Sequence, residues 1–318
     1  MNDDPDESFV IQTLLRHRPH VLTTEPARGE VRCYAPGDDA ARVGPETLVT
    51  VDTMVQGIHF DARLSAGDVG WKLVAVNASD IGAMGALPSW ALLSLSLPSP
   101  LDRAWVRDFA EGMGEALAAF SVHLVGGDTT ASPGPVIASM TMAGSSPAPV
   151  SRSGAQPGDV LWVTGALGEA AAGFLHGTVA GLVALRRPLP PVAFGAALAE
   201  AGCVHAMMDL SDGLARDLGR MCRSSGVSAM VDPTSLPLGP GLAEVAAPLP
   251  AQVGFGEDYQ LLFAAAPADT PAVEQVAAAQ QVRVQAIGGF LDHAGDPVAR
   301  LRGQEWPAAG FTHFGRSP

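Results

Sequence analysis

The residues best placed to do chemistry in this sequence are carboxylates that end apolar segments next to glycine. They occur in Gly37-Asp38-Asp39-Ala40, Val49-Thr50-Val51-Asp52, Asn77-Ala78-Ser79-Asp80-Ile81-Gly82, Val125-Gly126-Gly127-Asp128, Asp209-Leu210-Ser211-Asp212-Gly213 and Gly256-Glu257-Asp258-Tyr259. A carboxylate among apolar residues is costly to desolvate unless a positive group compensates it. Few arginines adjoin these motifs, so we expect a hard divalent cation. Oxygen ligands with almost no nearby His or Cys favour Mg²⁺ over zinc.

Each motif alone has a structural explanation, because Asp before Gly is common in turns and Asp-x-Ser-Asp is a good start for a helix. The set as a whole favours a magnesium cluster that does phosphoryl chemistry on a nucleotide. In this interpretation Gly126 and Gly127 let backbone N–H groups approach phosphate oxygens, while Asp128 binds a metal. Arg152 would hold a phosphate from the second half of the chain, although an ordinary solvated arginine is the alternative.

Composition excludes several classes of protein. The 318 residues contain 19 Lys and Arg against 33 Asp and Glu, a net charge of −14. This balance argues against binding to nucleic acid or to anionic membranes, both of which need clustered basic residues. The single lysine stands in Gly70-Trp71-Lys72-Leu73, which is neither a Walker A loop nor a protein-kinase motif. Metal ions, backbone amides and arginine must therefore do any phosphate binding.

Other motifs favour a cytoplasmic protein without hydrolase chemistry. The sequence has no His-Glu-x-x-His and no convincing Ser-His-Asp set. Cys33, Cys203 and Cys222 have no short spacing, which indicates neither a disulfide framework nor a zinc site. The acidic N-terminus is unlike a signal peptide, and prolines interrupt the uncharged segment 81–101, so we expect no membrane span.

Periodicity and turn signals predict an α+β fold with two domains of similar size. We expect strands over 46–51, 90–97, 122–125, 136–143, 160–164, 259–265 and 282–287, and helices over 8–17, 67–81, 103–120, 193–201, 214–224 and 273–280. Asp68 is the expected N-cap of the second helix. The Ser- and Pro-rich segment 145–149 is the best linker, which divides the chain into 1–147 and 148–318.

Taken in order, these motifs resemble those of the thiamine-monophosphate kinase family. The matching segments add Gly57-Ile58-His59-Phe60, Ala83-Met84-Gly85-Ala86, 152–159 and Gly310-Phe311-Thr312-His313-Phe314 to the acidic motifs, and they extend over residues 8 to 314. The resemblance implies a two-domain fold like that of aminoimidazole ribonucleotide synthetase, with mixed sheets packed with helices in each domain. It also implies a homodimer joined through the N-terminal domains and transfer of the ATP γ-phosphoryl group to thiamine phosphate.

The resemblance further assigns roles to individual residues. Several Mg²⁺ ions would be held by Asp39, Thr50, Val51, Asp52, Asp80, Asp128, Asp209 and Asp212. ATP would contact Gly127, Asp128, Arg152 and Ser211, and the thiamine substrate would contact His59, Glu257 and Phe311. The family often carries Ser or Thr where this chain has Val51, so only the Val51 carbonyl could bind metal. Phe311 replaces a frequent Tyr or Trp, which preserves stacking but loses a polar contact.

Two other functions remain open at this stage. One is a different ATP-dependent enzyme of the same superfamily, such as a selenophosphate or purine-pathway synthetase. A selenophosphate synthetase should carry a reactive Cys in a glycine-rich N-terminal loop, and Cys33 before Tyr34-Ala35-Pro36 does not resemble that. The other is a non-catalytic protein that binds Mg–nucleotide.

Overall fold

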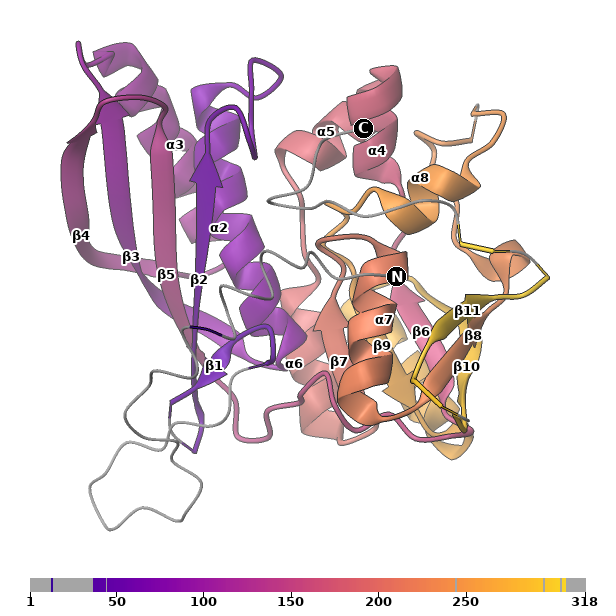
Figure 1. Ribbon diagram of the computed structural model, residues 1–318. Coiled ribbons are helices and arrows are strands. Elements are labelled where there is room, and N and C mark those ends of the chain that lie inside the picture. Colours follow the sequence, from indigo (N-terminus) through magenta and orange to yellow (C-terminus); the bar gives the residue numbers. More distant parts are fainter. Residues whose placement is uncertain are drawn as a thin grey trace.

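The first half of the chain forms a mixed sheet covered by helices on one face (Figure 1). The computed structural model describes residues 37–43, 45–243, 245–293, 295–303 and 305–306 and also Thr13, so the expected helix 8–17 lies outside the described residues apart from Thr13. The sheet order is β1-β2-β5-β3-β4, made of β1 (Ala41–Arg42), β2 (Thr47–Val55), β3 (Leu87–Pro98), β4 (His123–Ser132) and β5 (Ile137–Ser145). Only β3 and β4 pair in parallel among these described strands.

Helices α2 (Ala66–Ala83) and α3 (Arg103–Ala119) pack on the inner face of this sheet and share its apolar core. The N-cap prediction for α2 is wrong, because Ser65 is the cap and Asp68 lies at the third helical position. The Ser65 hydroxyl accepts from the Asp68 N–H, and the Asp68 carboxylate accepts from the Ser65 N–H. This reciprocal capping box satisfies two backbone donors at the start of the helix.

The second half forms another mixed sheet with helices on both faces. Its order is β11-β8-β10-β6-β9-β7, made of β6 (Val160–Thr164), β7 (Ala206–Asp209), β8 (Ser228–Val231), β9 (Leu261–Ala265), β10 (Val284–Leu291) and β11 (Ala299–Leu301). Its helices are α4 (Glu169–His176), α5 (Val179–Arg186), α6 (Val192–Ala201), α7 (Leu214–Ser225), α8 (Leu249–Gly254) and α9 (Thr270–Gln280). Leu161 and Val163 face the α7 side, whereas Trp162 faces α6 and α9.

The predicted fold class is confirmed, and two local expectations need correction. The strand expected over 122–125 does not end before Gly126, because β4 continues through the Gly-Gly-Asp motif to Ser132. The strand expected over 259–265 begins only at Leu261. The proposed domain boundary at 147/148 falls in the connection between β5 and β6, and its position stays a prediction. No helix within the described residues has the length and apolar composition to cross a membrane.

The two halves meet where the end of α2 crosses α6. A Cβ built on Gly195 would lie 2.2 Å from the carbonyl oxygen of Gly82, so only glycine allows this approach of the two backbones. Ala83 of α2 packs in the apolar cluster of the second half, and Val192 of α6 packs in that of the first half. The helix α2 is therefore part of both cores, and it positions side chains between them.

Candidate functional site

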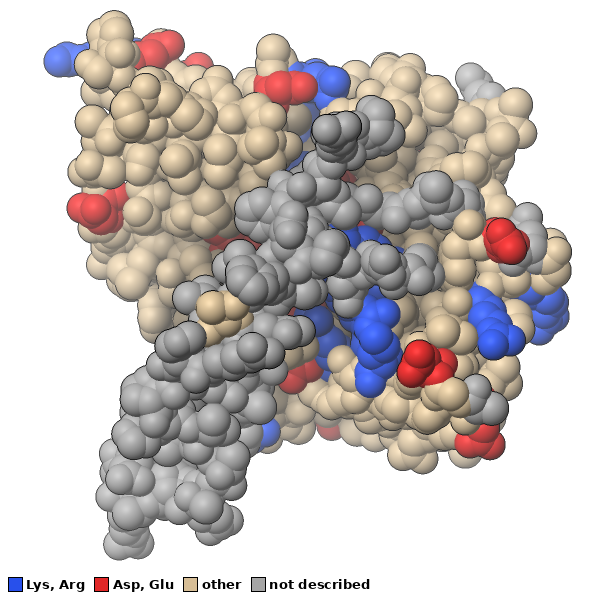
Figure 2. Space-filling view, in the orientation of Figure 1, with Lys and Arg blue, Asp and Glu red and all other residues tan. Residues whose placement is uncertain are grey.

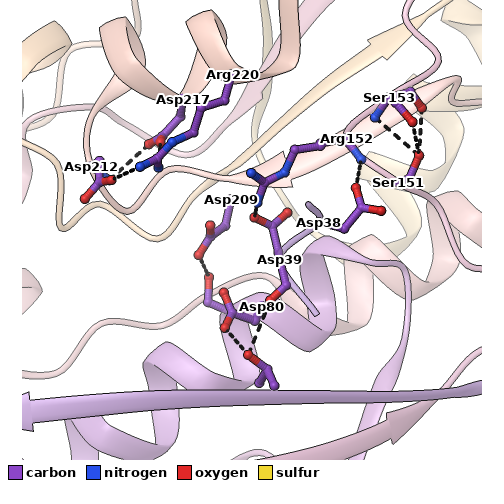
Figure 3. Close-up of polar contacts among 12 residues, drawn as sticks. Asp38, Asp39, Asp80, Ser151, Arg152, Ser153, Asp209, Asp212, Asp217 and Arg220 are labelled. Atoms are coloured by element: carbon purple, nitrogen blue, oxygen red, sulfur yellow. Dashed lines mark hydrogen bonds and ion pairs between the residues drawn. The ribbon is translucent and has the colours of Figure 1, made fainter. Parts of the chain in front are cut away.

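Three of the predicted carboxylates meet at the junction between the two halves (Figure 3). Asp39 precedes β1, Asp80 lies in α2 and Asp209 is the last residue of β7. One carboxylate oxygen from each residue lies within 4.8 Å of the others. Two of these elements belong to the first half and one to the second, so the cluster exists only when both halves are packed together.

The pKa values of the three clustered carboxyl groups are raised. Burial raises the pKa of Asp80 well above its usual range, and the nearby charges of Asp52 and Asp209 raise it further. Burial likewise raises the pKa of Asp209, with Asp39 adding to the effect. Burial also raises the pKa of Asp39, although the Arg152 guanidinium acts in the opposite direction. Like charges this close need either a proton or a cation between them.

A hard divalent cation fits these residues. The donors are carboxylate oxygens, which suit Mg²⁺ rather than a softer metal. Among the described residues, Oδ2 of Asp39 is buried without a hydrogen-bond partner, which is the state expected of an oxygen that a cation would use. The Thr50 hydroxyl adds an oxygen beside them, 2.5 Å from Oδ2 of Asp80 and 3.3 Å from the Asp39 carbonyl.

Strand β2 turns alternate residues toward and away from this cluster. Thr50 and Asp52 face α2, where the Asn77 side chain accepts the Asp52 N–H at 3.1 Å. Ser79 of α2 donates to Oδ2 of Asp209 at 2.6 Å and so ties α2 to β7. Val51 is 62% exposed, because its side chain points to the opposite face of the sheet. Only its backbone is available to the cluster side.

Two arginines from the second half reach the carboxylates. Arg152 forms an ion pair with Asp39 and donates its backbone N–H to Asp38 at 2.8 Å. Arg220 of α7 contacts Oδ2 of Asp212 at 2.7 Å and Oδ1 of Asp217 at 2.9 Å. Asp39 and Asp212 therefore each have an arginine partner, and the divalent cation expected at these acids stays a prediction. The sequence does not show Arg152 as a neighbour of Asp39, because folding brings the two together from 113 residues apart.

Asp217 and Arg220 are functional candidates that the sequence interpretation missed. Burial, and after it the nearby charge of Asp212, raise the pKa of Asp217 to about 7. Oδ2 of Asp217 accepts the Asp212 N–H at 3.0 Å, and Oδ1 forms the ion pair with Arg220. Asp217 therefore fixes both the loop that follows β7 and the Arg220 side chain. The sequence could have indicated this pair, because Asp217 and Arg220 lie three residues apart in a predicted helix that follows an acidic motif.

The structure does not bring Gly127 and Asp128 to the cluster of the same chain. Asp52, Met140, Leu93 and Gly127 form one row across the sheet. Three strand spacings separate the ends of this row, or about 14 Å. Asp128 lies in the neighbouring row with Ser94, Ser139 and Thr53, on the exposed face away from α2.

The predicted substrate residues lie in two loops. Nδ1 of His59 accepts the Val55 N–H at 3.0 Å in the turn that follows β2. Glu257 forms an ion pair with Lys72, which is only 2% exposed and also donates to the Leu185 carbonyl at 3.0 Å. The sequence interpretation gave Lys72 no role, although a single lysine among the apolar residues of a predicted helix indicates a buried charge that needs a partner. Phe311 lies outside the described residues.

The loop that carries Glu257 is held in an unusual backbone conformation. Glu257 has φ +64° and Tyr259 has φ +48°, values that side chains other than glycine seldom adopt. The Glu257 N–H donates to the carbonyl of Ser211 at 2.8 Å, and the Tyr259 N–H donates to that of Leu210 at 2.9 Å. The Asp258 carboxylate accepts the Gly168 N–H at the start of α4. The loop is thus fixed to the segment between Asp209 and Asp212.

Comparison with known proteins agrees with the two-domain fold. Residues 37–145 match the N-terminal domain, and residues 156–296 the C-terminal domain, of AIR synthase related proteins. The thiamine-monophosphate kinase of Haemophilus influenzae is 35% identical over 306 residues, which cover 88% of this chain and 92% of that protein. The Caulobacter vibrioides thiamine-monophosphate kinase is 37% identical over 81% of this chain and 78% of its own length.

Solved structures give the same result. The complex of AaThiL with AMPPCP and TMP has a TM-score of 0.81 at 28% identity, covering 97% of this chain and 96% of that one. The thiamine-monophosphate kinase of Stenotrophomonas maltophilia has a TM-score of 0.75 at 33% identity, with coverages of 95% and 96%. The hydrogenase maturation protein HypE of E. coli has a TM-score of 0.67 at 18% identity and shares the fold.

Proposed function

Because the chain belongs to the thiamine-monophosphate kinase family of AIR synthase related proteins, we propose that it transfers the γ-phosphoryl group of ATP to thiamine monophosphate. The products are thiamine diphosphate and ADP. The observation that supports this most directly is the meeting of Asp39, Asp80 and Asp209 within 4.8 Å between the two halves. A carboxylate cluster suits a reaction between two phosphate anions, in which charge neutralisation and alignment are the main requirements.

We assign the metal site to residues of both halves. The ligands would be Asp39, Asp80 and Asp209 with Thr50, Asp52, Asp212 and the Val51 carbonyl beside them. Several bound Mg²⁺ ions would neutralise the phosphate oxygens and hold them in line. Thr50, Asn77 and Ser79 orient the acids through the hydrogen bonds described above, so the donor set is positioned before a metal arrives.

The acceptor needs no general base. A phosphate monoester has a second pKa of about 6, so its oxygens are already largely ionised at neutral pH. We therefore propose direct in-line transfer without a catalytic acid or base and without a phosphorylated enzyme. Incubation with radiolabelled ATP in the absence of an acceptor should leave the protein unlabelled, and a stable phosphoprotein would contradict the direct mechanism.

The remaining roles follow the same assignment. Gly127, Asp128, Arg152 and Ser211 would contact ATP, and His59, Glu257 and Phe311 would contact the thiamine substrate. The strained Glu257 loop supports this, because backbone strain of this kind is retained where a site needs a fixed geometry. The loop's bonds to Leu210 and Ser211 link the proposed substrate side to the proposed nucleotide side.

We further propose a homodimer formed through the uncovered face of the first sheet. This face carries the exposed apolar side chains of Val51, Trp90 and Leu92, and Val125 of β4 is also exposed. Figure 2 shows that the surface over β3, β4 and β5 has few charged residues away from its margins. A sheet face of this kind is typical of a subunit interface. Asp128 lies on it, so we place Asp128 at the active site of the partner copy.

An assay of ADP release with thiamine monophosphate as the acceptor tests the function. We expect ADP only when acceptor, ATP and Mg²⁺ are all present. ADP formation that requires selenide or a purine-pathway substrate would indicate another enzyme of the superfamily. Nucleotide binding without turnover on any acceptor would indicate a non-catalytic relative. The excess of Asp and Glu over Lys and Arg, and the free buried thiols of Cys203 and Cys222, support a cytoplasmic enzyme.

Mixed dimers test the position of Asp128. Asp52→Asn and Asp128→Asn should each remove most of the activity and change its dependence on Mg²⁺. If Asp128 acts across the dimer, a mixture of the two inactive variants should regain activity after subunit exchange, because each heterodimer then contains one intact site. A mixture that exchanges subunits and stays inactive would place Asp128 in its own chain's site.

A further inference from the structure

Lys72 is a buried charge to which the proposed function gives no role. It is the single lysine of the chain and lies inside α2, where its side chain is only 2% exposed. A buried ammonium is costly unless another group pairs with it. Its Nζ donates to the Leu185 carbonyl at 3.0 Å and to Oε2 of Glu257. Because Lys72 is closed to solvent, any part it takes in binding a substrate must act through Glu257.

The backbone of the Glu257 loop is fixed, but the Glu257 side chain needs a support of its own. Residues 257–259 are held by the hydrogen bonds to residues 210–211 and to the start of α4 described above. These bonds set the point at which the Glu257 side chain leaves the loop, and they do not restrain its rotatable bonds. A side chain of this length loses rotamer entropy when a ligand immobilises it. The ion pair with Lys72 removes that freedom before a ligand binds.

The carboxylate of Glu257 keeps one oxygen for a ligand. Lys72 occupies Oε2, whereas Oε1 accepts no hydrogen bond within the described part of the chain. The Glu257 side chain is 27% exposed, so a ligand can reach it. Burial, and after it the charges of Glu257, Asp52 and Asp209, raise the pKa of Tyr259 well above its usual range. The Glu257 carboxylate and the acids beside the proposed metal site therefore lie around the same buried side chain.

We propose that Lys72 is a positioning residue that holds Glu257 so that its Oε1 faces the thiamine substrate. The proposal rests on the contact with thiamine monophosphate that the proposed function assigns to Glu257. The Leu185 carbonyl at the end of α5 fixes the ammonium, so α2 and α5 together set the direction of the carboxylate. Thiamine monophosphate has an amino group on its pyrimidine ring and a positive charge on its thiazolium ring, and both suit a carboxylate oxygen.

The Michaelis constants for the two substrates test this role. Lys72→Met should raise the KM for thiamine monophosphate roughly 5- to 30-fold, because Glu257 is no longer held in place. The KM for ATP should stay within a factor of about two and kcat should change little, because an interaction made equally with the bound substrate and the transition state affects KM alone. A merely structural role for Lys72 would instead raise both Michaelis constants or lower kcat.

A Glu257→Ala background shows whether Lys72 acts through Glu257. Glu257→Ala alone should raise the KM for thiamine monophosphate roughly 10- to 100-fold, because a charge-assisted contact is lost. Adding Lys72→Met should cause no further rise, because no carboxylate is left to position. A further rise in the double variant, or an unchanged KM for thiamine monophosphate in folded Lys72→Met, would overturn the proposal.

The matched control is Trp71→Phe, at the neighbouring position of α2. It removes the hydrogen bond from Nε1 to the Pro188 carbonyl, 3.0 Å long, and leaves the pair of Lys72 and Glu257 in place. It should change neither Michaelis constant. If Lys72→Met does not fold, Lys72→Gln, with an uncharged donor on a shorter stem, carries the same comparison. An unchanged KM in Glu257→Ala would refute the substrate contact of Glu257 and this proposal with it. A wild type that releases no ADP with thiamine monophosphate would instead refute the proposed function.

Discussion

Removing Glu257 should destabilise the protein more than removing Lys72, although the two residues form one ion pair. Lys72 is 2% exposed and Glu257 is 27% exposed, so the two charges differ in their access to water. Glu257→Ala leaves the buried ammonium with the Leu185 carbonyl as its one acceptor among the described residues, which should cost about 3 kcal/mol of the free energy of unfolding. Lys72→Met retains the aliphatic stem and leaves a carboxylate that water can reach, which should cost about 1–2 kcal/mol.

A double-mutant cycle measures this interaction. The double variant removes both charges of this pair and leaves neither one unpaired, so its cost should fall below the sum of the two single costs by about 1–3 kcal/mol. Urea denaturation followed by circular dichroism gives the apparent free energies. Glu257→Gln is the matched control, because its amide oxygen can still accept from Lys72 and its stability should lie between those of the wild type and Glu257→Ala. Additive effects, or a larger cost for Lys72→Met than for Glu257→Ala, would refute the reasoning.

Three further outcomes are expected. Burial raises the pKa of Asp258 to about 7 from an ordinary 3.8, so the folded protein retains a proton that the unfolded chain releases. Stability should therefore fall as pH rises from about 4 to about 7, and Asp258→Asn should flatten that part of a melting-temperature profile; an unchanged slope would assign it to other groups. Gly195→Ala should lower the melting temperature because its Cβ would meet the Gly82 carbonyl at 2.2 Å. Gly114→Ala, which faces open space in α3, should leave the melting temperature unchanged or raise it, so equal effects would contradict the packing argument. Asp52→Asn should remove most of the activity and change its dependence on Mg²⁺, as described above, and activity assayed against Mg²⁺ concentration checks this.

Hydrophobic periodicity predicted the long elements well. Helices α2, α3 and α7 have sustained apolar faces, and they lie within a few residues of the predicted ranges. The short strands β7, β8 and β11 were missed because segments of three or four residues contain too little periodicity to recognise. The helix α5 was also missed, since Val179, Val183 and other apolar residues on it are exposed and give no clear face.

The sequence interpretation named Arg152 and most of the site's acids, but it missed Asp217, Lys72 and Arg220. Asp39, Asp80 and Asp209 stand in recognisable glycine-flanked motifs, and the fold brings them together. Lys72 and Arg220 lie inside helices, where a charged residue looks like part of a solvated face. Their roles depend on residues 185 and 8 positions away in the chain. The position of Asp128 could not be predicted either. It depends on the order of strands in the sheet, which places β4 three strands away from β2, and the sequence does not show that order.

The shared helix α2 also restricts how the molecule can move. Hinge opening between the halves would have to separate Gly82 from Gly195 and withdraw Val192 from the first core and Ala83 from the second. Buried apolar contacts of this kind oppose such a motion, so the two sheets should move as one rigid body. Lys72 and Asp80 belong to the same helix, and the spacing between the Glu257 loop and the carboxylate cluster is thereby fixed by the helical rise. This distance is thus a property of secondary structure, set before any ligand binds.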